Sequence, residues 1–238
     1  MADGIYPTLT RQMGLMREME MIAQNVANAS TTGYRAEGLI FSEHVVSGGR
    51  RAPSLSMAHA TGREISFRQG ALEQTNGTYD LAIEGDGYFL VGVEDVPHLT
   101  RSGAFTSGPD GGLTTLEGNP VLDEGGAPVF VPPGSGDVRV APDGTLSADG
   151  QPIGQIAVVL PEDPNAMIRH AGTMFAADGY APVENPKVAQ GFLEASNVDP
   201  VLQIARMVAV QNAYEMGQGF MDREDERMRA MFRLMDRQ

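Results

Sequence analysis

The sequence contains no cysteine and no tryptophan among its 238 residues. Without cysteine there are no disulfide bonds, no thiolate metal ligands and no cysteine nucleophile, although the compartment stays open because an exported protein can lack thiols too. No apolar run approaches the roughly 18–20 residues that cross a bilayer, so direct membrane insertion is not expected. The first residues, MADGIYPTLTRQMG, lack a basic start followed by an apolar segment, so no cleaved signal peptide is expected either.

Basic residues are also few. Lysine and arginine number 17 against 31 acidic residues, which gives a formal net charge of -14. The two ends, residues 1–38 and 197–238, are each near -1, so the charge of about -12 lies between them. Binding to nucleic acid depends on a basic stripe that releases counterions, and the sequence has none. Near-neutral ends on an acidic middle predict ends that pack against other chains and a middle that stays solvated.

The first forty residues predict one amphipathic helix and its end. Apolar residues recur every three or four positions from Ile5 to Asn28, namely Ile5, Leu9, Met13, Met16, Met19, Ala23 and Val26. Asp3 is a candidate cap, and Pro7 falls in the first turn, where its missing N–H matters least. The helix should stop between Asn28 and Gly33, because Asn, Ser and Thr compete for backbone hydrogen bonds and glycine adopts the left-handed conformation.

The middle of the chain, from Phe41 to Ala189, predicts β-structure throughout. Short alternating runs are separated by glycine, proline and Asp-Gly turns every 8–12 residues, which is typical of an antiparallel sandwich or irregular barrel. The run YDLAIEGDGYFLVGV predicts a strand, a turn at Gly85-Asp86-Gly87 and a second strand, hence a hairpin.

The chain then returns to helix from Asn197 to its end, with Asn197 or Asp199 as cap and Pro200 at the start. An apolar position recurs every seven residues, at Met207, Tyr214, Met221, Met228 and Met235. The companion position three residues later is interrupted: it holds Val210, Gly217, Glu224 and Met231. A stripe of this kind requires a partner helix, but its interruptions argue against a simple two-stranded zipper.

These patterns predict an α+β protein with two parts. Residues 1–38 plus 190–238 form a terminal helical domain whose amphipathic helices pair as a coiled-coil-like bundle, and residues 39–189 form a central all-β domain. The helices could pair only with each other, or could also pack against other subunits. We favour the second, because an ordered residue costs roughly 1–2 kcal/mol of backbone entropy and one buried stripe per helix offsets little of this. Mobile, protease-sensitive ends around a stable core of about 40–190 are then expected.

Groups that carry enzymatic or metal chemistry are not recognisable. The histidines His44, His59, His98 and His170 are isolated and lack metal-ligand spacing. Asp-Gly pairs are ordinary turn residues, and no phosphate loop, dinucleotide fingerprint or nucleophile elbow is present. We therefore expect no enzyme activity, no catalytic residue, no cofactor and no metal. A secreted carbohydrate-binding protein would need an aromatic platform or a carboxylate pair, and neither is evident.

Several segments together resemble the bacterial flagellar rod and hook proteins. They are IAQNVANASTTGYRAE, YDLAIEGDGYFLV, LTRSGAF followed by DGGLTTLEGNPVL, ADGQPIGQI and GFLEASNVDPVLQIARMVAVQNAYE, and they span nearly the whole chain. Within that family, the short length and the NASTTGYRAE ending are most similar to a proximal rod subunit. Distal rod or hook-type subunits are the alternatives.

The resemblance implies a structural role in the drive shaft of the flagellar basal body, with the terminal helices as the inner tube and the β-domain as the outer layer. It implies partners among other rod proteins, copies of itself and the flagellar type III export apparatus, and a location in the periplasmic rod. The residues expected to pack between subunits are Met16, Met19, Asn25, Asn28, Thr32, Gly33, Tyr34, Asn197, Val198, Val201, Met207, Tyr214, Met221 and Met228.

Overall fold

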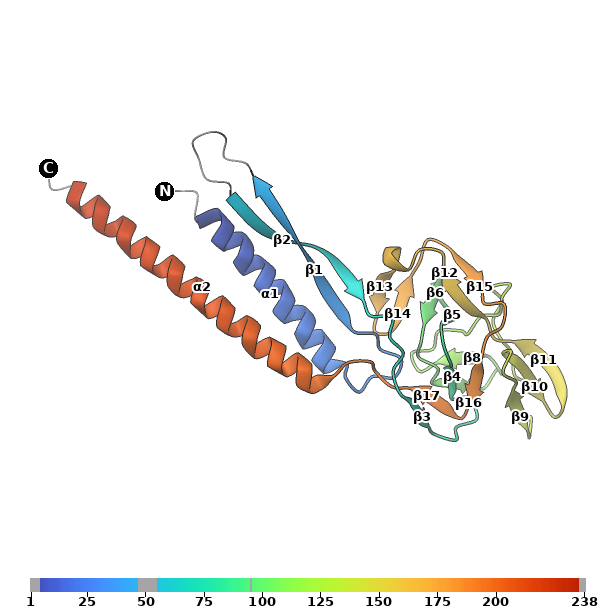
Figure 1. The fold of residues 1–238 in the computed structure, drawn as a ribbon. Coiled ribbons are helices and arrows are strands. Elements are labelled where there is room, and N and C mark those ends of the chain that lie inside the picture. Colours follow the sequence, from blue (N-terminus) through green and yellow to red (C-terminus); the bar gives the residue numbers. More distant parts are fainter. Residues whose placement is uncertain (1–4, 47–54, 95, 236–238) are drawn as a thin grey trace. The chain divides into compact units, whose positions relative to one another are not determined.

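The computed structural model describes residues 5–46, 55–94 and 96–235 and shows an α+β chain, with a helix at each end and strands between them (Figure 1). The chain folds into two compact units. The helical unit comprises the described parts of residues 1–27, 37–65 and 199–238, and the β unit comprises those of residues 28–36 and 66–198. The α+β class predicted from the sequence is confirmed.

The helical unit contains two helices and a long hairpin. Its elements are α1 (Ile5–Ala27), β1 (Glu37–Val46), β2 (Leu55–Ile65) and α2 (Pro200–Met235). The strands pair antiparallel from Glu37↔Ile65 to Val46↔Leu55, and their register shifts between Ile40 and Phe41. Helix α1 packs against α2 and against the hairpin. The core of this unit is formed by Met21, Ile22 and Val210, with Leu15, Met19, Val26, Leu39 and Met207 packed around them.

The end of α1 and the start of α2 follow local signals that the sequence predicts. Helix α1 ends at Ala27, and Gly33 has the positive φ of +69° expected for the chain reversal. At the start of α2, Oδ1 of Asp199 accepts from the backbone N–H groups of Val201 and Leu202, so Asp199 caps the helix and Pro200 is its first residue. The alternative cap, Asn197, has other partners that are described below.

The β unit consists of short strands whose pairings are all antiparallel among the described residues. They are β3 (Leu72–Gln74), β4 (Leu81–Ile83), β5 (Tyr88–Val93), β6 (Val96–Thr100), β7 (Phe105–Ser107), β8 (Leu113–Thr115), β9 (Val138–Val140), β10 (Thr145–Ala148), β11 (Gln151–Gln155), β12 (Val158–Pro161), β13 (Ile168–Ala171), β14 (Met174–Ala176), β15 (Tyr180–Pro182), β16 (Val188–Gln190) and β17 (Phe192–Glu194), with a 3-10 turn η3 (Pro164–Ala166).

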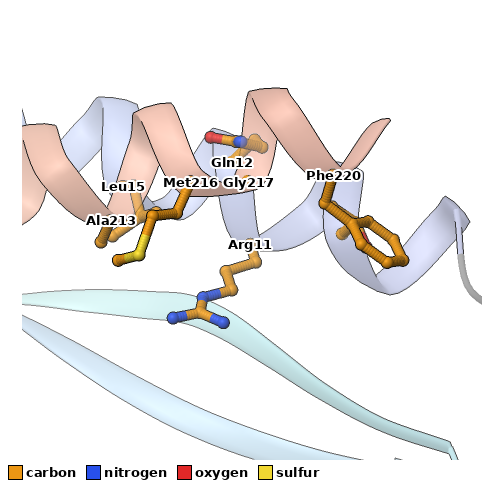
Figure 2. A pocket seen from close by; sticks show the side chains of 8 residues that line it. Arg11, Gln12, Leu15, Ala213, Met216, Gly217 and Phe220 are labelled. Atoms are coloured by element: carbon orange, nitrogen blue, oxygen red, sulfur yellow. The ribbon is translucent and has the colours of Figure 1, made fainter. Parts of the chain in front are cut away.

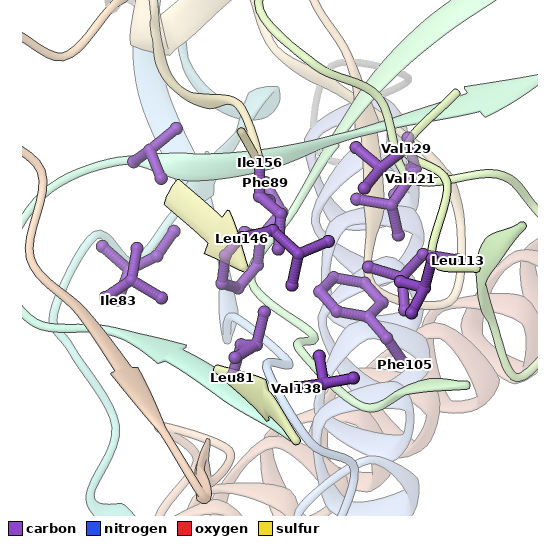
Figure 3. Close-up of a cluster of buried hydrophobic side chains, with 14 of the residues drawn as sticks. Leu81, Ile83, Phe89, Phe105, Leu113, Val121, Val129, Val138, Leu146 and Ile156 are labelled. Carbon is purple, nitrogen blue, oxygen red and sulfur yellow. The ribbon is translucent and has the colours of Figure 1, made fainter. Parts of the chain in front are cut away.

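The largest sheet has six strands in the order β13-β14-β6-β5-β12-β15. Strands β9, β10 and β11 form a three-stranded sheet, and β16-β4, β17-β3 and β7-β8 form two-stranded sheets. Figure 3 shows the side chains of the shared core, among them Leu81, Phe89, Phe105, Leu113 and Leu146, each at most 5% exposed. Because strands from several sheets contribute to one cluster, the β unit has a common core.

The hairpin predicted for Tyr79–Val93 is wrong. Strand β4 pairs with β16, and β5 instead forms a hairpin with β6, from Phe89↔Thr100 to Val93↔Val96. The segment Gly85-Asp86-Gly87 does reverse the chain, but its carbonyl groups face a distant side chain: Arg101 donates to the carbonyls of Ile83, Gly85 and Gly87. A turn signal involves only neighbouring residues, whereas Arg101 lies fourteen or more residues from these carbonyl groups along the chain.

The compact units divide the chain differently from the segments expected from the sequence. Residues 28–36 belong to the β unit, and the hairpin of residues 37–65 belongs with the helices. Strand patterns say which residues pair but not on which unit a hairpin packs. How the domains are divided in an assembly, with boundaries near 38 and 190, stays a prediction.

Candidate functional site

Helix α2 carries apolar side chains on two opposite faces. On the face toward α1, Val210 is buried and Met207 and Tyr214 are half-buried, as the seven-residue repeat predicts. Burial declines at the end of this repeat: Met221 is still half-buried, whereas Met228 is 37% exposed. The exposed apolar residues on the other side are Val201 (77% exposed), Leu202, Ile204 and Val208, and Met216 and Phe220 are exposed where α2 borders a groove beside α1. An exposed apolar face of this extent is typical of a surface that binds another protein.

Helix α1 also exposes apolar side chains. Of the stripe predicted from the sequence, Met19 and Val26 pack on the core of the helical unit, whereas Leu9, Met13 and Met16 are each about half exposed. The buried face instead includes the polar residues Gln12, Glu18 and Asn25 in addition to Met21 and Ile22. Periodicity identified the helix but not the face that is buried within this chain.

The interrupted companion position at Gly217 has a structural cause. Figure 2 shows Gln12 of α1 beside Gly217 of α2, in a groove of about 270 Å³ that Arg11, Met216 and Phe220 also line. Nε2 of Gln12 donates to the carbonyl of Tyr214 at 2.9 Å. A Cβ at position 217 would lie 2.2 Å from Nε2 of Gln12, so glycine makes the room that the amide needs.

A charged pair also joins the two helices. Nε and Nη2 of Arg206 each lie 2.8 Å from Oε1 of Glu18. Glu18 is nearly buried, whereas the side chain of Arg206 is 45% exposed, so solvent screens the pair and its contribution to stability is modest.

The polar residues predicted to end α1 are divided between the two units. In the helical unit, the side chain of Asn25 is fully buried and exchanges two hydrogen bonds with the backbone of Glu37. In the β unit, Asn28 accepts from the backbone and the hydroxyl of Thr31, and Thr32 is half-buried. These contacts lie within one chain, and the role of these residues between subunits stays a prediction.

Gly33 and Tyr34 are buried in the β unit. The N–H of Gly33 donates to the carbonyl of Glu194 at 2.7 Å, and a Cβ on Gly33 would lie 2.3 Å from the backbone nitrogen of Ser102. The guanidinium of Arg169 lies over the ring of Tyr34, 4.4 Å from its centroid, and donates to the carbonyl of Arg35. Tyr34 is only 3% exposed, so its ring is already covered within this chain.

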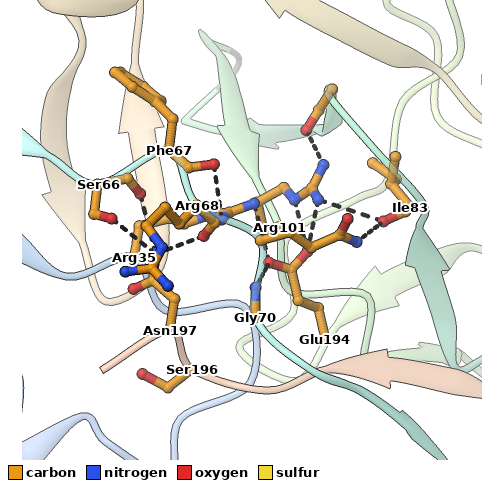
Figure 4. A network of polar contacts seen from close by, with 12 residues as sticks. Arg35, Ser66, Phe67, Arg68, Gly70, Ile83, Arg101, Glu194, Ser196 and Asn197 are labelled. Atoms are coloured by element: carbon orange, nitrogen blue, oxygen red, sulfur yellow. Dashed lines mark hydrogen bonds and ion pairs between the residues drawn. The ribbon is translucent and has the colours of Figure 1, made fainter. Parts of the chain in front are cut away.

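A buried charged network lies next to this loop (Figure 4). The carboxylate of Glu194 pairs with Arg35 at 3.0 Å and with Arg101 at 2.7 Å, and all three side chains are at most 3% exposed. Arg35 also donates to the carbonyls of Phe67 and Arg68, and the backbone N–H of Gly70 donates to Glu194 at 3.0 Å. The network therefore ties residues 35, 66–70, 101 and 194 of the β unit together.

Asn197 completes the same region. Its side-chain oxygen accepts from the N–H of Ala36 at 2.7 Å, and its amide donates to the carbonyls of Ser66 and Arg68. The chain passes between the two units at 27/28, 36/37, 65/66 and 198/199. The Asn197 contacts hold Ala36 and Ser66, which are the β-unit ends of two of these connections, and Val198, the β-unit end of a third, is buried at 7% exposure.

Burial shifts the pKa of two groups in this region. Burial lowers the pKa of the Arg35 guanidinium from its ordinary value, and the nearby Glu194 carboxylate opposes that effect. Burial raises the pKa of Tyr88, while Arg35 and Arg101 act in the opposite direction. The phenol of Tyr88 is therefore neutral beside two guanidinium groups.

Sequence reasoning missed Arg101, Arg169 and Glu194 as individual residues. Arg101 and Glu194 lie within the segments LTRSGAF and GFLEASN. The likeness of these segments to known proteins drew attention to the segments as a whole, but it did not indicate that these two charged residues pair. Their partners lie far away along the chain, 93 residues apart in this pair, so no local spacing could reveal them.

Two histidines that the sequence analysis treats as isolated are neighbours. The ring centroids of His98 in β6 and His170 in β13 lie 4.6 Å apart, and Nδ1 of His98 lies 3.0 Å from the carbonyl oxygen of Val96. The side chains of His44 and His59 lie outside the described residues. In the part of the chain that the structure describes, no cluster of three or more histidine, aspartate or glutamate side chains could hold a metal ion. Neither described helix has a segment sufficiently long and apolar to span a bilayer.

Comparison with known proteins identifies the class. Family models match three segments: "Flagella basal body rod protein" at residues 9–35, "Flagellar hook protein FlgE/F/G D1 domain" at 82–148 and "Flagellar basal body rod FlgEFG protein C-terminal" at 189–234. These matches cover both helices and the central strands, in the order in which the sequence resemblance places them. The fold and these segments define an axial protein of the flagellar rod and hook class.

Individual relatives specify the family further. The chain is 36% identical over 236 residues to a flagellar basal-body rod protein FlgF from Caulobacter vibrioides, covering 97% of this chain and 96% of that protein. It is 36% identical to FlgF from Mesorhizobium japonicum, covering 90% of each chain, and 31% identical to FlgF from Salmonella typhimurium, covering 91% of each. The chain belongs to the flagellar basal-body rod protein family and is of the FlgF type.

Proposed function

We infer that this protein is a structural subunit of the flagellar basal-body rod, in its proximal part. The observation that carries this conclusion is the likeness to FlgF proteins over nearly the whole chain. The family is one of structural rod proteins, so the role is mechanical. The exposed apolar faces of both helices support it, because surfaces of this kind are suited to packing between subunits.

The energetics favour assembly through these faces. Burying one valine, leucine or methionine side chain contributes roughly 1.5–3 kcal/mol. Helix α2 exposes Val201, Leu202, Ile204, Val208, Met216 and Phe220. Burial of even half of these residues against a neighbour stabilises a contact substantially, since each leaves water on association. In the assembled rod we propose that α1 and α2 pair as a coiled-coil-like bundle in an inner tube, with the β unit, as a sandwich or irregular barrel, outside it.

The partners follow from this role. They are other rod proteins and copies of this chain, with the predicted packing residues Met16, Val201 and Met228 already exposed in the single chain. The subunit reaches the periplasmic rod through the flagellar type III export apparatus. The net charge of -14 supports the absence of nucleic acid among the partners.

A gene deletion tests the function. A strain that lacks this chain should be non-motile and should contain a truncated basal body, and the intact gene should restore both. A motile deletion strain with complete basal bodies would exclude the rod function.

Two matched variants test the packing face. Val208 in α2 is 53% exposed and Val96 in β6 is 54% exposed, so an aspartate alters the isolated fold little at either position. We expect Val208→Asp to prevent rod assembly and motility, because it places a charge in the packed face. Val96→Asp should support motility. Full motility with Val208→Asp would refute the assignment of this face.

A further inference from the structure

The β unit has a small pocket next to the buried charged network. Its volume is about 200 Å³, and its lining includes the buried residues Arg35, Tyr88, Arg101 and Pro161 together with the exposed residues Phe67 and Leu160. Phe67 is 43% and Leu160 39% exposed, so these apolar groups lie toward solvent. Small-molecule sites typically have about 300–1,000 Å³. The pocket therefore suits one or two side chains better than a cofactor.

The buried part of this pocket is short of negative charge. Arg35 and Arg101 share the carboxylate of Glu194, and Tyr88 adds no negative charge, since burial raises further the pKa of a phenol that is already neutral at pH 7. Asp86 also lines the pocket, but it is exposed to solvent. The Nε–H of Arg35 is buried and has no hydrogen-bond partner among the described residues, although Arg35 is only 3% exposed. A buried guanidinium N–H without an acceptor is costly, so an additional negative charge near Arg35 would be favourable.

We propose that this pocket receives the turn residues Leu116 and Glu117 of a second copy of this chain. The proposal rests on the rod function inferred above, because it requires neighbouring copies. The apolar side chain of Leu116 would fill the space beside Phe67 and Leu160, and the carboxylate of Glu117 would lie near the guanidinium of Arg35 and compensate its charge. The contact thus supplies both the apolar body and the negative charge that the pocket lacks.

The turn has the matching properties. Leu116 is 74% exposed, more than any other large apolar side chain in the described part of the β unit. Glu117 follows it directly and is exposed. The turn is held rigidly: Gly118 donates to the carbonyl of Thr115, and Thr115 donates to the carbonyl of Asn119 at 2.8 Å. A preorganised turn loses little conformational entropy on binding.

The pocket and the turn are separate sites of the β unit, since none of the residues that line the pocket comes from the turn. A contact between them is therefore heterologous, and each bound copy presents a free turn or a free pocket to the next. Contacts of this type generate rings or helical arrays rather than closed dimers. This property agrees with the axial assembly proposed for the chain.

The absence of cysteine permits a direct test. Full-length Leu116→Cys and Leu160→Cys chains, carrying tags of different mass, are mixed under mild oxidation, and the mixed disulfide is measured on a gel. The control replaces Leu116→Cys with Ile168→Cys, since Ile168 is 71% exposed and is not followed by a carboxylate. We expect the Leu116→Cys pair to form at least about tenfold faster than the control pair, a factor that an energetic preference of the size of one charge-assisted hydrogen bond produces.

A charge variant checks the proposed chemistry. Adding Glu117→Gln to the Leu116→Cys chain should slow the mixed disulfide about tenfold, because the amide lacks the charge that pairs with Arg35. Phe67→Cys offers a second position at the pocket if Leu160→Cys folds poorly. Equal rates for the Leu116 and Ile168 pairs, or no effect of Glu117→Gln, would refute the proposal.

The same pair is then examined in basal bodies purified from a deletion strain that expresses both tagged chains. Mixed disulfides from Leu116→Cys and not from Ile168→Cys support the contact. Basal bodies that contain both chains without this disulfide refute the contact and leave the rod function intact. If no basal bodies form, the rates in solution decide. A motile deletion strain refutes the rod function itself, so the two failures are distinguishable.

Discussion

Oε2 of Glu194 lies 2.7 Å from Nη2 of Arg101, and both side chains are 1% exposed. The other oxygen of the same carboxylate pairs with Arg35. One buried carboxylate thus compensates two buried guanidinium groups that come from the loop after α1 and from the end of β6. Because such a charge is costly to bury alone, the pairing makes the last strand, β17, essential to the β unit.

Glu194→Gln should therefore destabilise the β unit by about 3–5 kcal/mol, the cost of leaving a buried partner uncompensated. Urea unfolding followed by circular dichroism measures this change. Glu184→Gln is the control, because Glu184 is exposed and should change the free energy of unfolding by less than about 0.5 kcal/mol. A Glu194→Gln protein as stable as the control would contradict the importance of the pairing.

Gly33→Ala should destabilise the protein by two effects. Its φ of +69° is unfavourable for alanine, and the added Cβ would lie 2.3 Å from the backbone of Ser102. Gly150→Ala separates these effects, because Gly150 has a φ of +79° but nothing within 4 Å of the added Cβ. We expect a loss of about 1–2 kcal/mol at Gly150 from the backbone alone, and at least about 1–3 kcal/mol more at Gly33 from the overlap. Equal losses in thermal or urea unfolding would show that the close approach has no energetic consequence.

Gln12 and Gly217 should be energetically coupled. Gly217→Ala improves helix propensity by about 1 kcal/mol but displaces the amide of Gln12 from the carbonyl of Tyr214. In a Gln12→Ala background only the improvement remains, so Gly217→Ala should be more favourable there by about 0.5–3 kcal/mol. Gly219→Ala is the control, since nothing lies within 4 Å of its added Cβ. The same effect at Gly217 in both backgrounds would exclude the coupling.

Alkaline pH should weaken the β unit through Tyr88. Its pKa in the folded protein is raised by burial, while the unfolded value is about 10. The stabilisation is complete below about pH 10 and is lost as the pH rises through the folded pKa, because only the unfolded chain ionises freely. The fall in unfolding free energy between pH 8 and pH 11 should be smaller in Tyr88→Phe than in the natural protein. An equal fall in Tyr88→Phe and the natural protein would contradict the assignment.

Mild trypsin should cut the isolated protein first near the end of α2. Arg223, Arg227 and Arg229 are exposed there, and burial against α1 has declined by this point, so local opening needs little free energy. Arg101 in the β unit is 2% exposed and should be protected. Mass spectrometry of the early fragments identifies the first sites. Initial cleavage within residues 66–198, or an intact full-length chain, would contradict mobile helical ends.

Particular elements show how far sequence reasoning reaches. The start of α2 was predictable because Asp199 and Pro200 act on adjacent backbone groups, and the end of α1 because Asn28 to Gly33 act within one turn. The repeat from Met207 to Met221 indicated the face of α2 that is less exposed, since helical periodicity relates positions on one element. For α1 the same reasoning selected Leu9, Met13 and Met16, which are exposed, because apolar residues lie on both of its faces.

The pairing of strands and charges was not predictable in this way. A hairpin between β4 and β5 followed from the Gly85-Asp86-Gly87 turn, but Arg101 and β16 provide partners that the local pattern does not contain. The network of Arg35, Arg101 and Glu194 joins residues up to 159 positions apart. In the sequence Gly217 is a defect in a stripe, and only the fold places Gln12 against it.

By itself, the sequence determined the two terminal helices, the β character between them and membership of an axial protein family, because these depend on local periodicity, caps and contiguous motifs. Only the tertiary structure decided which faces of the helices are covered, which strands pair, and which carboxylate accompanies the two buried arginines. The physical reason is that burial and charge compensation depend on distances in space, and those distances arise only once segments far apart in the chain have packed together.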